Sequence, residues 1–180
     1  DLFVKDAKTI LHRYKDKAKY CIVINQINLI QFEPFNSTAI PYDTVDHYEE
    51  ASYQAIHNQF VASAKIYEYG KKLNPEMQIG TMVADCTAYP FSCDPDDIIL
   101  ALRRNRMEYF YTDVQFRGEY PQYALNYFAE NNIHLEITEE DKAILQANTM
   151  DYLAISYYYS QMVDSKKNHL NPASVTANPN

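Results

Sequence analysis

Apolar side chains recur at steps of three and four residues in two long stretches of the chain, which is the spacing of one face of an α-helix. The first stretch predicts a helix over residues 4–14. The second predicts a helix over residues 48–72, which ends at Asn74-Pro75 because the residue before a proline avoids helical geometry. The stripe of the second helix consists of Tyr53, Ile56, Phe60, Ala64 and Tyr67.

Further along the chain, helix starts are marked by capping residues. Asp94-Pro95-Asp96-Asp97 combines a capping Asp, a proline in the first turn and acids that complement the positive end of a helix dipole. We expect this helix to extend past Phe110. A further helical piece follows over residues 121–128, and Thr138 with Asp141 forms a capping pair for a last short helix.

Three shorter apolar runs indicate buried strands. They lie at residues 20–24, 79–84 and 152–159, and helical stretches separate them. Strands that alternate with helices pair in parallel through right-handed crossovers. The pattern therefore predicts an α/β fold built from about three parallel βα units.

Two stretches show no period, and each contains two prolines. Residues 31–47 follow the first strand, so we interpret them as a long loop. Residues 164–180 are polar and predict a loop or a disordered tail. We therefore expect one folded domain over residues 1–163, followed by a polar segment over residues 164–180.

The composition of the chain limits the classes of partner and the cellular compartment that we expect. The chain carries 24 acidic against 16 basic residues, a net charge of −8, without a dense basic cluster, so nucleic acid is a poor partner. No apolar run approaches the ~18 residues that span a bilayer, so we expect no membrane partner. Three cysteines without paired spacing favour a reducing compartment, the cytoplasm. The first residues lack an initiator Met and the form of a signal peptide, from which we expect a trimmed, processed or excised chain.

Metal and cofactor binding are not indicated. The five histidines are widely spaced and form no H-x-x-x-H pattern or His/Cys pair, whereas metal ligands come at short, fixed spacings. The three glycines form no phosphate-cradling loop. We therefore expect no metal site and no cofactor.

The first predicted strand ends in three side-chain amides, Asn25, Gln26 and Asn28. In α/β folds, polar groups at the carboxyl ends of parallel strands form active sites. Polar groups at a strand end also serve simply to complete hydrogen bonds. The pattern by itself leaves both interpretations open.

Four blocks of the sequence resemble one protein family, in the family's order. They are Asn25-Gln26-Ile27-Asn28, Tyr53-Gln54-Ala55-Ile56-His57, Asp113-Val114-Gln115 with Arg117-Gly118, and Ser156-Tyr157-Tyr158. They resemble the family 1 glycoside hydrolases, most of all the bacterial 6-phospho-β-glucosidases, which are cytosolic and act on phosphorylated β-glucosides. The resemblance implies a partial TIM (β/α)8 barrel, about strands four to six, because the whole fold typically takes ~250 residues. The family's nucleophilic Glu and phosphate-binding loop would then lie outside this chain.

The resemblance also implies roles for three residues. Gln26 stands where the family has its acid/base Glu, Asn25 matches the residue that binds the sugar 2-hydroxyl, and Tyr158 matches the tyrosine that orients the nucleophile. A Gln amide donates a hydrogen bond, but near neutral pH it neither delivers a proton nor acts as a general base. Ser156 stands where many relatives have Asn, so its role is open.

Three explanations of Gln26 remain. It is a substitution that traps substrate, a natural departure like that of the plant myrosinases, which carry Gln here and cleave thioglucosides, or a mark of lost activity. Glu33, in the loop after the first strand, is an alternative source of the missing acid.

Two functions are therefore open. The chain is part of a retaining 6-phospho-β-glucosidase, and by itself we expect it to be inactive because no aligned position supplies the nucleophile. Alternatively, it is a non-catalytic partial barrel that binds sugar phosphate or self-associates through exposed sheet edges.

Overall fold

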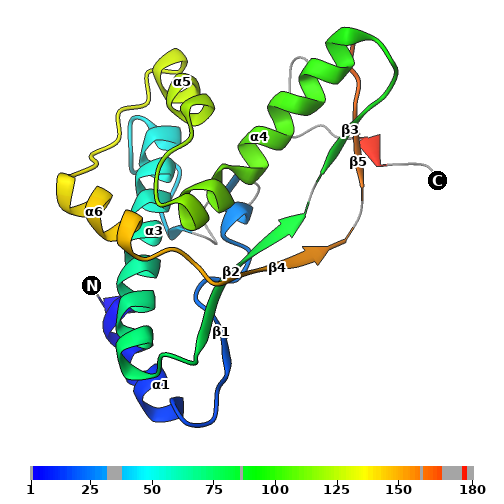
Figure 1. Cartoon of the computed structure of the whole chain (residues 1–180). Coiled ribbons are helices and arrows are strands. Elements are labelled where there is room, and N and C mark those ends of the chain that lie inside the picture. The colour runs from blue at the N-terminus through cyan, green and yellow to red at the C-terminus, as the bar shows by residue number, and fades with distance from the viewer. Residues whose placement is uncertain (1, 32–37, 86, 159, 168–175, 178–180) are drawn as a thin grey trace.

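The computed structural model describes residues 2–31, 38–85, 87–158, 160–167 and 176–177. Its centre is a sheet of three parallel strands in the order β1-β2-β4 (Figure 1). The strands are β1 (Tyr20–Ile22), β2 (Gln78–Asp85) and β4 (Tyr152–Tyr157). All three predicted strands and their parallel pairing are thus confirmed. Strand β1 ends at Ile22 instead of residue 24, and β4 ends at Tyr157, before residue 159, which lies outside the described residues.

The helices begin and end close to the positions that the apolar stripes and capping residues predict. The Asp94 carboxylate accepts a hydrogen bond from the Asp96 N–H at 3.1 Å, and Thr138 and Asp141 form a complete capping box. Gly118 ends its helix in the left-handed region at φ 72°, where a side chain would be strained. The helices are α1 (Leu2–Tyr14), α3 (Tyr48–Leu73), α4 (Pro95–Arg117), α5 (Gln122–Glu130) and α6 (Glu139–Ala147).

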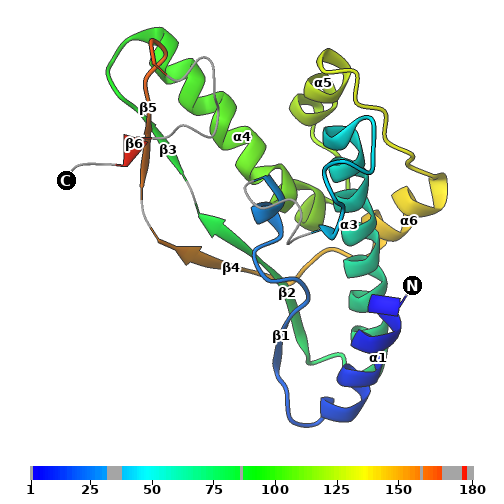
Figure 2. The same cartoon turned by 180° about the vertical axis from the view of Figure 1, so that it is seen from behind.

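Helices connect the strands in the manner of βα units. Helix α3 connects β1 to β2, and α4, α5 and α6 lie between β2 and β4 in the chain. Figures 1 and 2 show α1 and α3 side by side on one side of the sheet. A buried cluster holds these two helices to β2 and consists of Leu11, Ile66, Met77, Ile79 and Met150.

The larger core combines aliphatic and aromatic side chains and joins α3, α4 and α5. At its centre the Phe110 side chain is 0% exposed, and its ring centroid lies 5.9 Å from that of Phe60 and 6.2 Å from that of Phe128. Edge-to-face contacts of this kind stabilise a core beyond simple burial of area. Two buried side chains of the 3-10 helix η1 (Ile27–Gln31), Ile27 and Ile30, also pack into this core. The segment that follows β1 is therefore anchored to the helical layer.

A second small sheet was not predicted from the sequence. It consists of β3 (Ala88–Pro90), β5 (Gln161–Val163) and β6 (Thr176–Ala177), with β3 parallel and β6 antiparallel to β5. Strand β6 lies within residues 164–180, so the prediction of loop or disorder over that whole segment is wrong at β6. Strands of two or three residues carry no alternation that a sequence pattern could reveal. The proposed division of the chain at residues 163 and 164 stays a prediction.

In the part of the chain that the structure describes, no strand covers either edge of the central sheet. Within the described residues, β1 and β4 each pair only with β2. Side chains on the outer strand β4 are unusually exposed for a parallel sheet, with Leu153 at 38% and Ile155 at 56%. None of the described helices combines the length and apolar character that crossing a bilayer requires.

Candidate active site

The carboxyl ends of β1, β2 and β4 meet at one edge of the parallel sheet, as in barrel enzymes that place their active sites there. Past the end of β1 the chain turns at residues 25–26 and enters η1. Past the end of β4 comes Tyr158. The residues that the sequence indicates as functional therefore follow the carboxyl ends of β1 and β4 at this edge.

Gln26 and Tyr158, which are 132 positions apart in the chain, are in direct contact. The Gln26 Nε2 donates a hydrogen bond to the Tyr158 Oη at 2.6 Å. Gln26 is partly buried, whereas Tyr158 is 65% exposed. The structure thus brings together the two residues predicted for the acid/base position and for orienting the nucleophile, while their catalytic roles stay predictions.

Gln26 adopts an uncommon backbone conformation. Its φ angle is 50°, in the left-handed region that non-glycine residues seldom occupy. The turn is closed by a hydrogen bond from the Leu29 N–H to the Gln26 carbonyl at 2.9 Å. Such conformations persist where the surrounding structure holds them, and they concentrate at functional sites.

Asn25 lies next to this contact and is exposed. Its side chain makes no hydrogen bond to any other residue that the structure describes. An exposed amide with both donors and its acceptor free has the chemistry of a sugar-hydroxyl ligand. The role of Asn25 as the ligand of the sugar 2-hydroxyl stays a prediction.

Asn28, the third amide at the end of the first predicted strand, is a buried residue to which the sequence assigned no individual role. Its side chain is 1% exposed, and its Oδ1 accepts from the Ala84 N–H at 2.8 Å while its Nδ2 donates to the Ala84 carbonyl at 2.7 Å. The same Nδ2 also donates to the Glu108 Oε2 at 3.0 Å. The available signal was its place among the three amides that follow the first predicted strand.

Glu108, on α4, is a buried carboxylate close to this edge. It is 2% exposed, and its Oε1 lies 3.7 Å from the Arg104 Nη2. Burial raises the pKa of Glu108 above its ordinary value, while the hydrogen bond from Asn28 and the charge of Arg104 oppose that rise and the charge of Asp85 adds to it. Glu108 was not predicted as part of the site, and Asn28 was indicated only as one of the three amides at the strand end.

Asp85 supplies a second carboxylate, at the end of β2. Its Oδ1 accepts from the Thr87 N–H at 2.9 Å and from the Tyr109 hydroxyl at 3.1 Å, and the Thr87 hydroxyl contacts both of these side chains. Ser156, on β4, donates through its hydroxyl to the Met82 Sδ at 3.4 Å. These contacts tie Asp85 to the β2–β3 connection and Ser156 to the neighbouring strand.

The remaining candidate residues do not follow the strand ends, or they lie outside the residues that the structure describes. Glu33 lies outside the described residues. Within the described part of the chain, no group of three or more His, Cys, Asp or Glu side chains has the arrangement of a metal site. His57 is 1% exposed, and its Nδ1 lies 3.0 Å from the Tyr120 Oη. Burial lowers the pKa of His57, while Asp141, whose Oδ2 lies 3.5 Å from its Nε2, opposes that shift.

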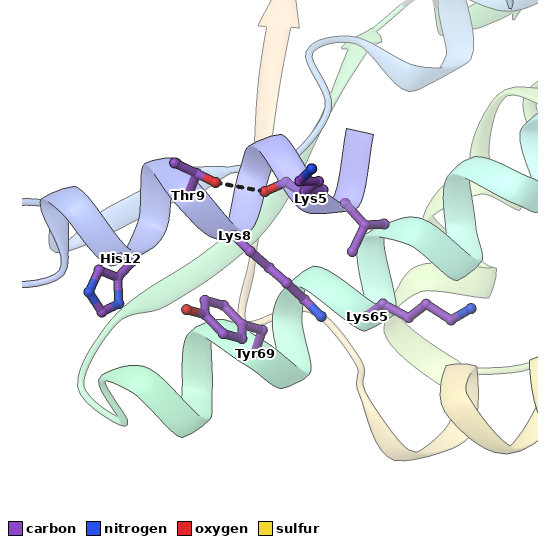
Figure 3. A pocket seen from close by; sticks show the side chains of 7 residues that line it. Lys5, Lys8, Thr9, His12, Lys65 and Tyr69 are labelled. Atoms are coloured by element: carbon purple, nitrogen blue, oxygen red, sulfur yellow. Dashed lines mark hydrogen bonds between the residues drawn. The ribbon is translucent and has the colours of Figure 1, made fainter. Parts of the chain in front are cut away.

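A groove of about 640 Å³ opens between α1 and α3 (Figure 3). None of the residues that line the groove comes from the strand ends, so the groove and the candidate active site are formed by different segments of the chain. The Lys8 Nζ lies 5.3 Å from the centre of the Tyr69 ring. The groove is lined by Val4, Lys5, Lys8, Thr9, His12, Lys65 and Tyr69.

The fold has close counterparts among solved structures. A family 1 β-glucosidase from Thermotoga maritima superimposes with a TM-score of 0.76 at 18% identity, covering 99% of this chain and 38% of the other. A β-glucosidase from Exiguobacterium marinum superimposes with a TM-score of 0.75 at 18% identity, covering 99% and 40%. The chain therefore has the fold of part of a TIM (β/α)8 barrel, as the sequence predicts.

Sequence relatives identify the family of barrel enzymes. The profile described as glycosyl hydrolase family 1 matches residues 1–180. Aryl-phospho-β-D-glucosidase BglH of Bacillus subtilis is 38% identical over 170 residues, which are 94% of this chain and 36% of that protein. The 6-phospho-β-glucosidase AscB of Escherichia coli is 33% identical over 168 residues, 93% of this chain and 35% of that protein. The chain belongs to family 1 of the glycoside hydrolases and spans about a third of the length of these relatives.

Proposed function

We propose that the chain is part of a retaining 6-phospho-β-glucosidase that hydrolyses phosphorylated β-glucosides in the cytoplasm, with Gln26 at the acid/base position. In this proposal Asn25 binds the sugar 2-hydroxyl and Tyr158 orients the nucleophile. The observation that carries it is the hydrogen bond between Gln26 and Tyr158 at the carboxyl edge of the parallel sheet. Relatives named as phospho-β-glucosidases, 33% to 40% identical to this chain, support the phosphorylated substrate.

Retaining hydrolysis needs two carboxyl groups, one that attacks the anomeric carbon and one that protonates the leaving oxygen and then activates water. Gln26 has one N–H engaged with Tyr158, which leaves its second N–H and its Oε1 for substrate. A hydrogen bond from that N–H to the glycosidic oxygen orients the leaving group without transferring a proton. The site therefore favours leaving groups that need little protonation, such as nitrophenolates and thiolates.

Substrate discrimination tests the proposed function in the complete polypeptide that carries this chain. We expect kcat/KM for a nitrophenyl 6-phospho-β-glucoside to exceed that for the unphosphorylated glucoside by about 100-fold or more, because hydrogen bonds to a charged group contribute roughly 1.5–3 kcal/mol each. An activated aryl leaving group keeps the reaction measurable with Gln at position 26. Equal kcat/KM values for the two substrates would contradict the phosphorylated-substrate proposal.

The alternative, a non-catalytic partial barrel that self-associates, is favoured by one observation. Strand β4 has exposed apolar side chains and an outer edge that pairs with no other described strand. It predicts that the 180-residue chain sediments as a dimer or larger species at micromolar concentration. Replacing Ile155, which is 56% exposed, with Lys should shift that species to monomer because an edge charge disfavours strand pairing. A monomeric parent chain in sedimentation velocity would rule this hypothesis out.

A further inference from the structure

The side chain of Asn28 continues the β1–β2 ladder after β1 has ended. The last backbone bond of that ladder runs from the Val23 N–H to the Gly80 carbonyl at 3.1 Å. Four residues further along β2, Ala84 exchanges two hydrogen bonds with the Asn28 amide, at 2.7 and 2.8 Å. An amide side chain thus satisfies both backbone groups of a buried strand residue, which would otherwise be costly to bury.

Glu108 fixes the orientation of that amide. The Asn28 Nδ2 carries two hydrogens, and the structure gives it two acceptors, the Ala84 carbonyl and the Glu108 Oε2. Flipping the amide would present Oδ1 to two acceptors and leave both without a donor. Because Glu108 is on α4, the contact joins the helical layer to the turn after β1.

The turn held in this way contains Gln26. Asn28 is two residues after Gln26, and the Leu29 N–H closes the turn on the Gln26 carbonyl. The positive φ of Gln26 is strained for a residue with a side chain, so it requires support from its surroundings. Two supports are present: the apolar contacts of Ile27 and Ile30, and the polar contacts of Asn28.

We infer that Asn28 and Glu108 are positioning residues, which hold Gln26 in the conformation that reaches Tyr158. The inference rests on the proposed role of Gln26. It adds two residues, outside the reacting groups, that support Gln26 in that role. The apolar contacts of Ile27 and Ile30 fix how deeply η1 is packed. The hydrogen bonds of Asn28 fix the register of η1 along β2, because Ala84 offers one donor and one acceptor at a single position.

The chemical shift of the Tyr158 ring reports this register, and it is measured without any assay of hydrolysis. In the 180-residue chain labelled with ¹³Cζ-tyrosine, the Tyr158 resonance is identified by its loss in Tyr158→Phe. Gln26→Leu should move that resonance because it removes the hydrogen bond to Oη. Glu108→Leu should move it in the same direction and at least half as far, whereas Glu108→Gln, which keeps an acceptor for Asn28, should restore the parent position.

Val114→Ala is the matched control, because Val114 is buried on the same helix and has no hydrogen bond to Asn28. It loosens the core without touching the polar contacts, so it should leave the Tyr158 resonance in place. The inference fails if Glu108→Leu leaves the Tyr158 resonance unmoved, or if Val114→Ala moves it as far as Glu108→Leu does. It also fails if Gln26→Leu has no effect, because the hydrogen bond between Gln26 and Tyr158 would then be absent in solution. These outcomes are independent of catalysis, so a failure of the proposed substrate does not decide them.

Amide exchange in the parent chain provides a second test that needs no variant to fold. The Ala84 N–H is bonded to Asn28 Oδ1, and the Leu29 N–H is bonded to the Gln26 carbonyl. If Asn28 holds the turn, both amides exchange through one opening step and have protection factors within about threefold of each other. Exchange of Leu29 that is faster than that of Ala84 by more than a factor of about thirty would show that the turn opens independently, which contradicts the inference.

Discussion

Replacing Gln26 with Glu in the complete polypeptide should raise kcat/KM for 6-phospho-β-glucosides with poor leaving groups by about 10²- to 10⁴-fold, the usual contribution of general acid–base catalysis. The side chain keeps its length, and a carboxyl group at this position can still form a hydrogen bond with Tyr158, now as the acceptor. It also gains a transferable proton. The gain should be small for nitrophenyl substrates in the step that expels the aglycone, because their leaving groups need little protonation.

Gln122→Glu is the matched control for this variant. It makes the same chemical change on the exposed surface of α5, away from the strand ends, and should leave kcat/KM unchanged. Values of kcat/KM for an alkyl and a nitrophenyl 6-phospho-β-glucoside, which report the step that expels the aglycone, give the comparison. If Gln26→Glu fails to increase the rate on the alkyl substrate, the proposal of an active glycosidase site with Gln26 at its acid/base position is wrong.

Truncating Phe110 should have the largest effect on stability. Phe110→Ala in the 180-residue chain is expected to reduce the free energy of unfolding by about 3–5 kcal/mol, through lost burial and the cavity that remains. The Phe110 ring is fully buried among Tyr53, Phe60, Tyr111 and Phe128, where several aromatic side chains from α3, α4 and α5 meet. Urea denaturation of the two chains measures the difference.

Phe3→Ala provides the comparison for that experiment. Phe3 is 48% exposed on α1, so its removal should change the free energy of unfolding by less than about 1 kcal/mol. A loss at Phe110 no larger than the loss at Phe3 would mean that the aromatic cluster is not the core that joins the helices.

Much of the fold could be predicted because local signals and tertiary structure agree. The stripe through Tyr53, Ile56 and Phe60 places its helix correctly, since all three side chains are buried. Thr138 and Asp141 mark the start of α6 through contacts only three residues apart. Parallel pairing followed from the alternation of strands with helices.

The second sheet could not be predicted, because pairing between β3 and β5 joins segments about seventy residues apart and neither has more than three residues. At the candidate site, the sequence and the family resemblance indicated Gln26 and Tyr158 but not their direct hydrogen bond. Asn28 was indicated only as one of three amides, because nothing local distinguishes an amide that pairs with a buried strand from one that faces solvent. Its partners Ala84 and Glu108 come from elements far along the chain.

The three explanations of Gln26 predict different kinetics. A site that has lost activity should gain little from Gln26→Glu, because its other groups would no longer be selected for the reaction. A substitution that traps substrate should gain on every poor leaving group and keep its affinity for the phosphorylated sugar. A departure resembling the myrosinases should show appreciable turnover with Gln26 itself on a 6-phosphorylated thioglucoside, whose leaving group needs little protonation.

The pH dependence of kcat/KM for the complete polypeptide and for its Gln26→Glu variant tests the central claim most directly, on a substrate with a poor leaving group. A catalytic carboxylic acid must be protonated to act, so activity falls as the pH rises through its pKa. We predict that the Gln26→Glu variant acquires such an alkaline limb and that the parent lacks it. Identical profiles for the two proteins would contradict the placement of Gln26 at the acid/base position.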